Sequence, residues 1–77
     1  MYWVSCIIQN NPNEKAWLCP CSEGQLTEQA AHRVAEQYIK TFRCLSVWID
    51  KEDNGVMTTI WHKALVDAFG HVENHDK

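Results

Sequence analysis

One amphipathic segment in the middle of the chain constrains the fold more than any other feature of this sequence. Between residues 27 and 43 the apolar side chains recur at intervals of three and four, which is the period of a helix with one buried face. Thr27 is a favourable N-cap residue, and Glu28 places a carboxylate near the positive end of the helix dipole. We therefore expect one long helix over about residues 28–43, with the ring of Phe42 in its buried stripe. The stripe consists of Ala31, Val34, Ala35, Tyr38, Ile39 and Phe42.

Four short segments that flank this helix are typical of β-strands, because they are rich in β-branched and aromatic residues and are bounded by turn residues. The segments are YWVSCIIQ (2–9), EKAWLC (14–19), LSVWI (45–49) and VMTTIW (56–61). A proline-containing turn separates the first two, and Asn54-Gly55 separates the last two, so each pair is predicted to form a hairpin. Alternation along the first and third segments assigns these side chains to the core: Val4, Cys6, Ile8, Leu45, Val47 and Ile49.

The C-terminal part of the chain is less clearly patterned. Residues 62–70 admit two readings: a short C-terminal helix ended by Gly70, which we favour, or a continuation of the fourth strand. The polar sequence of residues 71–77 predicts a flexible tail. We therefore predict an α+β fold with a single domain over residues 1–70. It is a small two-layer ββαββ sandwich in which an antiparallel sheet packs on the long helix.

The charge and the lack of targeting patterns argue against several classes of protein. Seven Lys and Arg residues against ten Asp and Glu residues give a net charge of −3, and the basic residues do not cluster, so nucleic-acid binding is not expected. The first residues lack a basic region followed by a long apolar run, which argues against a signal peptide or a membrane segment. We therefore expect a cytoplasmic protein. Because the sequence contains neither a glycine-rich phosphate loop nor a nucleophile motif, we expect no enzymatic activity and no cofactor.

Two cysteines flank a proline at Cys19-Pro20-Cys21, and this spacing raises the question of a metal site or a redox pair. Structural zinc sites usually take two ligands from a Cys-x-x-Cys turn and two more from a second element, and neither pattern occurs here. The simpler interpretation is that a strand ends at Cys19 because Pro20 stops it, and that the cysteines are reduced, small apolar residues. The alternative is a zinc-binding module, which requires Cys6 to lie opposite Cys19 in the first hairpin. Its ligands would be Cys6, Cys19, Cys21 and Cys44.

Four tryptophans in a chain of 77 residues provide the main functional lead, because Trp is enriched where proteins meet partners. With the core assignments above, Trp3, Ile7 and Trp48 lie together on the sheet face that points away from the helix. A three-residue turn in the first hairpin adds Trp17 to this face. A four-residue turn reverses the strand and buries Trp17 with Cys6 and Cys19 instead.

A broad apolar surface of this kind usually marks an interaction site in a soluble protein. We therefore expect a non-enzymatic protein-interaction module that binds a protein partner, most simply a second copy of itself in a homodimer. The expected partner-binding residues are Trp3, Ile7, Trp17, Trp48 and Trp61. Two other readings stay open. The C-terminal segment could cover the same face with Leu65 and Phe69, or the tryptophans could stack on a carbohydrate or other ligand in a groove.

Overall fold

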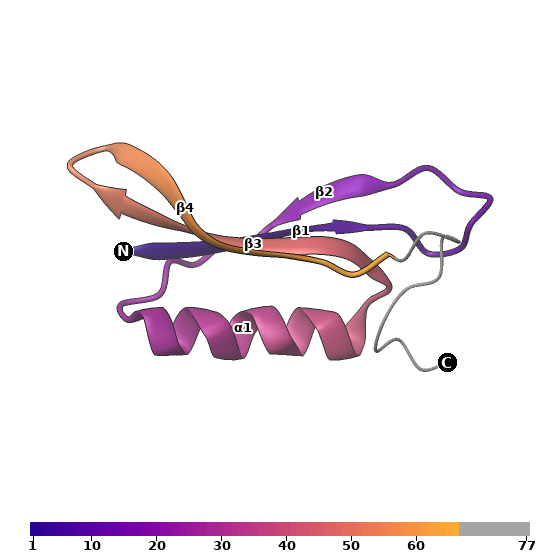
Figure 1. The fold of residues 1–77 in the computed structure, drawn as a ribbon, viewed down its shortest axis with the longest axis horizontal. Coiled ribbons are helices and arrows are strands. Elements are labelled where there is room, and N and C mark those ends of the chain that lie inside the picture. The colour runs from indigo at the N-terminus through magenta and orange to yellow at the C-terminus, as the bar shows by residue number, and fades with distance from the viewer. Residues whose placement is uncertain (67–77) are drawn as a thin grey trace.

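The computed structural model describes residues 1–66 as five elements in the order ββαββ, which confirms the predicted α+β class (Figure 1). The elements are strand β1 (Tyr2–Ile8), strand β2 (Trp17–Pro20), helix α1 (Glu28–Thr41), strand β3 (Cys44–Asp53) and strand β4 (Val56–Ala64). The four strands form one antiparallel sheet in the order β2-β1-β3-β4. Helix α1 packs on one face of this sheet, against the central strands β1 and β3 (Figure 1).

The β3–β4 hairpin closes through the predicted Asn54-Gly55 turn. Both residues have a positive φ, 53° at Asn54 and 81° at Gly55, which a tight two-residue hairpin turn requires. Asp53 pairs with Val56 directly across the turn, so the two strands are paired from their ends onward. Asparagine and glycine tolerate this backbone region better than other residues, which explains why the turn could be predicted.

The β1–β2 hairpin has a longer connection than the predicted one. Ile8 pairs with Trp17, so the connection between the paired ends runs over residues 9–16. Within it, the Asn11 carbonyl accepts a hydrogen bond from the Glu14 N–H at 3.0 Å, which closes a β-turn. The resulting register is the one that we expected from a four-residue turn rather than from a three-residue turn.

Pro20 lies at the edge of the sheet, where its missing N–H is tolerated. The Cys21 N–H donates to the Val4 carbonyl at 2.7 Å, which shows that the odd-numbered residues of this segment form the hydrogen-bonded pairs with β1. Pro20 is out of phase with these pairs, so its ring nitrogen faces the open edge of the sheet. Strand β2 therefore contains a proline without losing a hydrogen bond to β1.

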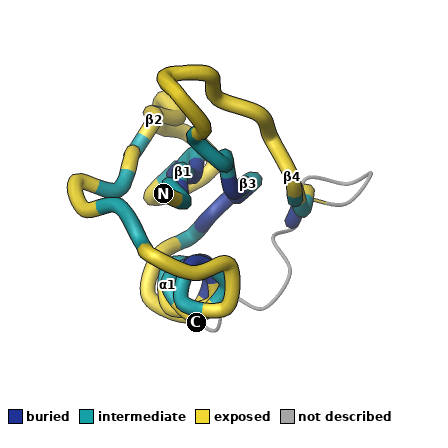
Figure 2. The backbone as a smooth tube through the Cα atoms, turned by 90° about the vertical axis from the view of Figure 1, so that its left-hand side faces the viewer, coloured by how far each residue is buried: buried dark blue, intermediate teal, exposed yellow. Residues whose placement is uncertain are grey.

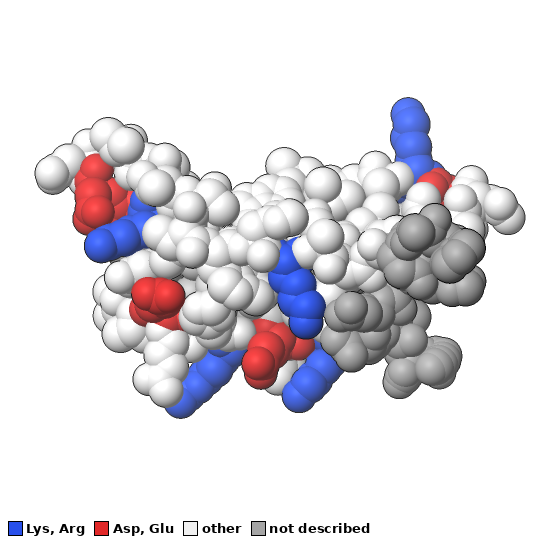
Figure 3. Space-filling model, viewed as in Figure 1, with Lys and Arg blue, Asp and Glu red and all other residues white. Residues whose placement is uncertain are grey.

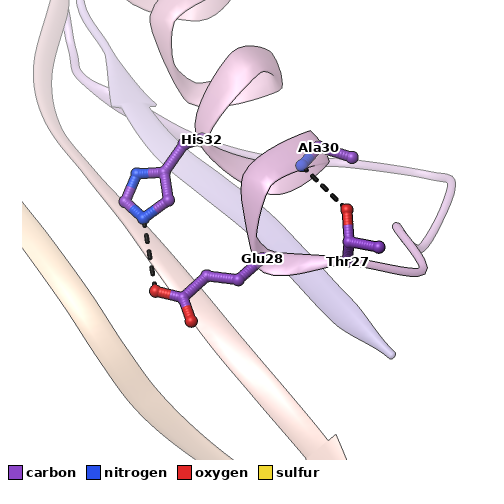
Figure 4. A network of polar contacts seen from close by, with 4 residues as sticks. All are labelled: Thr27, Glu28, Ala30 and His32. Carbon is purple, nitrogen blue, oxygen red and sulfur yellow. Dashed lines mark hydrogen bonds and ion pairs between the residues drawn. The ribbon is translucent and has the colours of Figure 1, made fainter.

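Helix α1 begins where the sequence predicts it. The hydroxyl oxygen of Thr27 accepts a hydrogen bond from the Ala30 N–H at 3.1 Å and caps the first turn (Figure 4). In the same turn, a carboxylate oxygen of Glu28 lies 3.5 Å from Nε2 of His32 (Figure 4). The helix ends at Thr41, before the predicted end.

The buried face of α1 differs from the predicted one in the last turn. Ala31, Ala35 and Ile39 are buried against the sheet. Phe42 is 37% exposed, so the prediction that its ring is buried is wrong. Phe42 is the C-cap residue and has an extended backbone (φ −122°, ψ 158°), which takes its side chain off the helical stripe. Its ring instead contacts Tyr38 edge-on, with the ring centroids 6.1 Å apart.

The core lies between α1 and the sheet and matches the predicted assignment with one exchange (Figure 2). The buried strand residues are Val4, Cys6, Ile8, Cys44, Val47 and Ile49. Leu45 was expected among them but is only partly buried, and Cys44 lies in the core instead. The cause is a shift in the β1–β3 register after Ile7, through which Ile8 pairs with Cys44.

Strand β4 continues through residues 62–64, so the C-terminal helix that we favoured does not begin there. Leu65 follows the strand, is buried, and donates its N–H to the Leu45 carbonyl at 2.9 Å. Pairing with β3 thus keeps residues 62–65 extended. The rest of the predicted helix, including Phe69, and the predicted tail lie outside the described residues. Within residues 1–66, no helix combines the length and the apolar character needed to cross a membrane.

Candidate functional site

The sheet face opposite α1, which we call the outer face, is not covered by any described segment (Figures 1 and 2). Strand alternation and the pairing register determine which side chains point to it, because directly paired residues share a face. Its central residues are Trp3, Ser5, Ile7, Leu18, Trp48 and His62. The predicted position of Trp3, Ile7 and Trp48 on this face is therefore confirmed, while their role in binding stays a prediction.

Trp48 lies near the middle of the outer face. It pairs with Ser5 of β1 on one side and with His62 of β4 on the other. The small Ser5 leaves room for the indole, and the His62 ring lies beside it with centroids 6.5 Å apart and an interplanar angle of 40°. Trp48 is partly buried by these neighbours and keeps part of its ring surface accessible. It is therefore the best-placed aromatic anchor for a partner on this face.

Trp3 is fixed at one end of the outer face by contacts within the molecule. Its Nε1–H donates to a carboxylate oxygen of Glu52 at 2.8 Å, and the Glu52 N–H donates to the Met1 carbonyl at 2.8 Å. The ring also packs against Gly24: a Cβ atom at that position would lie 3.1 Å from Trp3 and 2.5 Å from Met1. Because the polar atom of the indole is already satisfied, the part of Trp3 that remains accessible is apolar.

The charged groups that the described strands place on the outer face are two carboxylates, and both accept hydrogen bonds from neutral donors. One carboxylate oxygen of Asp50 accepts a hydrogen bond from the Thr59 hydroxyl at 2.6 Å, and Glu52 accepts the indole hydrogen bond described above. Lys51 and Lys63, the lysines of the described strands, pair with residues that point to the helix side. Figure 3 shows the outer face edge-on along the top of the molecule, and the middle of this margin carries no charged side chain.

Two of the predicted partner-binding residues do not lie on the outer face. Trp17 pairs with Ile8, which is buried on the helix side, so its expected place on the outer face is wrong. The cause is the parity of the β1–β2 connection, because one additional residue in a turn moves every side chain of the strand to the other face. Trp17 is 47% exposed, so its expected burial with Cys6 and Cys19 after a four-residue turn is also wrong. Leu18, which we did not single out, takes the outer position instead and is 58% exposed.

Trp61 also points to the helix side. It pairs with the buried Ile49, and its ring meets that of His32 on α1 edge-on, with centroids 5.0 Å apart. The register of β3 and β4 shifts between Ile49 and Asp50, which leaves Ile60 without a directly paired residue. Trp61 therefore helps to attach α1 to the sheet and is not available as a partner-binding residue of the outer face.

The four cysteines are free and all lie on or beside the core. Cys6 pairs with Cys19, which is the register that the zinc alternative required, and its thiol lies 3.7 Å from the Cys19 carbonyl oxygen. The Cys21 and Cys44 thiols each donate to a backbone carbonyl, at 3.1 and 3.3 Å. Within residues 1–66, no group of three or more His, Cys, Asp or Glu side chains is placed to hold a metal ion. The zinc alternative thus has the required register but lacks a close set of ligands in this part of the chain.

Three groups in this region have altered acidity. Hydrogen bonding to Cys44, together with burial, raises the pKa of the Cys6 thiol far above its ordinary value. The same hydrogen bond lowers the pKa of the buried Cys44 thiol. Burial and a hydrogen bond with Cys21 raise the pKa of the Tyr38 hydroxyl. The Cys6 thiol and the Tyr38 hydroxyl are therefore protonated at neutral pH, and neither acts as an activated nucleophile.

A hollow of about 470 Å³ lies on the helix side and is lined by Glu36, Ile39, Lys40 and Lys63. These lining residues place one carboxylate and two lysines around the hollow and include no serine, no cysteine and no second carboxylate. Comparison of the chain with protein-family models, with curated proteins and with solved structures gives no match. A functional interpretation therefore depends on the geometry described above, and the outer face is the strongest candidate.

Proposed function

We propose that the protein is a small, non-enzymatic interaction module that binds a second copy of itself through the outer face. The observation that carries this proposal is the group of Trp48, Ile7 and Leu18 on a sheet face that no described segment covers. Apolar surfaces of this kind on small proteins usually serve association.

The size of the outer face fits a homodimer. The molecule extends 39 Å along its longest axis, which follows the strands, and 19 Å along its shortest axis (Figure 1). A rectangle with these dimensions is about 740 Å², which is an upper bound for the flat extent of this face and of the same order as the roughly 800 Å² that each partner contributes to a standard stable interface. The outer face therefore has the order of size that a specific dimer needs.

The chemistry of the outer face also favours a second copy over a strongly acidic partner. Its two carboxylates, Asp50 and Glu52, are hydrogen-bonded within the chain, and the described strands place no Lys or Arg there. Both carboxylates lie toward the Trp3 end of the face, so two copies related by a two-fold axis can meet through the uncharged centre around Trp48. A strongly acidic partner would find no complementary charge on this face. The four free cysteines support a reducing compartment such as the cytoplasm for this assembly.

Native mass spectrometry of wild type and of Trp48→Asp tests the proposal. We expect the wild type at twice the 8.9 kDa chain mass and the variant at the single-chain mass, with an unchanged circular dichroism spectrum. Ile7→Thr, which keeps a β-branched side chain, should weaken the dimer with less risk to folding. Trp17→Asp is the matched control, because this tryptophan is exposed away from the outer face and its replacement should leave the dimer intact.

Two results would contradict the proposal. The first is a wild type that stays monomeric at micromolar concentration. The second is a monomeric Trp48→Asp variant that is unfolded, since this would mean that Trp48 is covered within its own chain. Loss of the dimer in Trp17→Asp as well would show that the interface lies elsewhere.

A further inference from the structure

Two cysteines on the helix side of the first hairpin lie directly opposite each other. Cys6 of β1 pairs with Cys19 of β2. The neighbouring pair, Val4 and Cys21, is a hydrogen-bonded pair, because the Cys21 N–H donates to the Val4 carbonyl at 2.7 Å. Cys6 and Cys19 are two residues further along and are therefore also a hydrogen-bonded pair, with a Cα separation of about 5.5 Å. Disulfides span Cα separations of about 4.4–6.8 Å, so the Cα separation of this pair lies within the range that a disulfide bridges, and the two Cβ atoms need to approach only slightly.

The other cysteines are less suitable partners. Cys19 and Cys21 are two residues apart in an extended chain, which separates their Cα atoms by about 6.6–7 Å, at the upper limit for a disulfide. The Cys21 thiol is also occupied by a hydrogen bond to the Glu23 carbonyl at 3.1 Å. Cys44 is opposite Ile8 instead of Cys6. Its thiol is hydrogen-bonded to that of Cys6, but both side chains are buried, so an oxidant in solution reaches neither of them first. Cys6 with Cys19 is therefore the pair that the strand register favours.

The exposure of the two thiols determines the order of events. Cys6 is 0% exposed, whereas Cys19 is partly exposed at the edge strand β2. An oxidant in solution therefore reaches Cys19 first. We propose that a hydroperoxide oxidises Cys19 and that Cys6 then forms a reversible cross-strand disulfide with it. This inference is independent of the outer face, because both thiols point to the helix side.

The chemistry balances with hydrogen peroxide as the oxidant. The Cys19 thiolate attacks one peroxide oxygen, the O–O bond breaks, and a sulfenic acid forms while hydroxide leaves and takes up the Cys19 proton as water. The Cys6 sulfur then attacks the Cys19 sulfur, the S–S bond forms, and the S–O bond breaks. The departing hydroxide takes the Cys6 proton and leaves as the second water. Two thiols thereby lose two electrons, which reduce one peroxide. The raised pKa of Cys6 keeps this thiol protonated, so Cys19 is the thiol of this pair that reacts with the peroxide first.

The disulfide would link the short edge strand β2 covalently to β1. β2 is a four-residue edge strand, and all of its residues except Cys19 are exposed. A bond from Cys19 to Cys6 closes a loop over residues 6–19 and restricts the unfolded chain. Oxidation should therefore stabilise the domain.

Mass spectrometry and thermal unfolding of the full chain, with and without hydrogen peroxide, test the inference. We expect oxidised wild type to lose two hydrogen atoms, to keep two of its four thiols open to alkylation after denaturation, and to give a linked Cys6–Cys19 peptide. The midpoint of thermal unfolding should rise by roughly 10 °C or more, and dithiothreitol should reverse the change. Cys19→Ser should abolish the disulfide and the rise, whereas Cys21→Ser and Cys44→Ser, as matched controls, should retain both.

Three results would overturn the inference. They are a disulfide that maps to Cys19–Cys21 or Cys6–Cys44, a product linked only between chains, and an oxidised wild type whose unfolding midpoint does not rise.

Discussion

Both faces of the sheet carry large apolar side chains, yet only the face toward α1 forms the core. On the helix side, the small residues Ala31 and Ala35 let α1 approach the sheet closely, so that Val4 and Ile49 are fully buried. On the outer face, Trp48 and its neighbours keep part of their surface accessible in the described structure. The comparison shows that apolar content alone does not determine which face forms the core. The core forms on the face where the narrow, alanine-lined stripe of α1 packs against the sheet.

The largest difference between the two faces should appear when isoleucine is replaced on each of them. Ile49→Ala removes a fully buried side chain and should lower the free energy of unfolding by about 2–5 kcal/mol, because it leaves a cavity beneath α1. Ile7→Ala, the matched change on the outer face, should cost less than about 1 kcal/mol in the monomer, since its side chain is only partly buried. Urea unfolding at low protein concentration measures both values. Equal losses would mean that the outer face is also a core.

Two tryptophans provide the next comparison. Trp61→Ala removes the contact with His32 on α1 and should lower the free energy of unfolding by about 2 kcal/mol, because the ring is partly buried between helix and sheet. Trp48→Ala should instead raise the dissociation constant of the dimer more than about tenfold, because the interface loses one large aromatic side chain. Thermal unfolding combined with dilution-dependent native mass spectrometry separates the two effects. The comparison fails if both variants change the same quantity.

The smallest effect is expected at the rim of the helix side. Phe42→Ala should lower the free energy of unfolding by no more than about 1 kcal/mol, because the ring is 37% exposed and its main aromatic contact is Tyr38. Ile39→Ala, one turn earlier on the buried stripe, should cost clearly more. Chemical denaturation of both variants measures the difference. A loss of several kcal/mol at Phe42 would place this ring in the core.

The features that could be predicted from the sequence depend on local patterns. The N-cap at Thr27 and the turn at Asn54-Gly55 follow from the conformational preferences of a few adjacent residues. The alternation of Trp3 and Trp48 with buried neighbours likewise needs only one strand at a time. The sheet face of Trp3 and Trp48 can therefore be predicted without knowing how the strands pair.

The features that could not be predicted depend on counting residues across a connection. Trp17 lies on the helix side because the number of residues in the connection over residues 9–16 is even. The identity of the turn residues alone does not determine this number. Trp61 points to the helix side and not to the outer face, because the unpaired Ile60 shifts the register of the β3–β4 pair by one residue. Phe42 lies outside the core because the helix ends at Thr41. The backbone of Phe42 is extended, so its side chain does not continue the buried stripe of α1.

Pro20 has a consequence for the growth of larger assemblies. A sheet polymerises into a fibre only if both of its edges accept a new strand. At the β2 edge, the position where an added strand would need a hydrogen-bond donor is occupied by the proline nitrogen, which has none. A strand added at the β2 edge therefore makes one hydrogen bond fewer, whereas β4 contains no proline. A single imino acid at the margin thus disfavours repeated edge-to-edge addition of this chain, despite its content of tryptophan, isoleucine and valine.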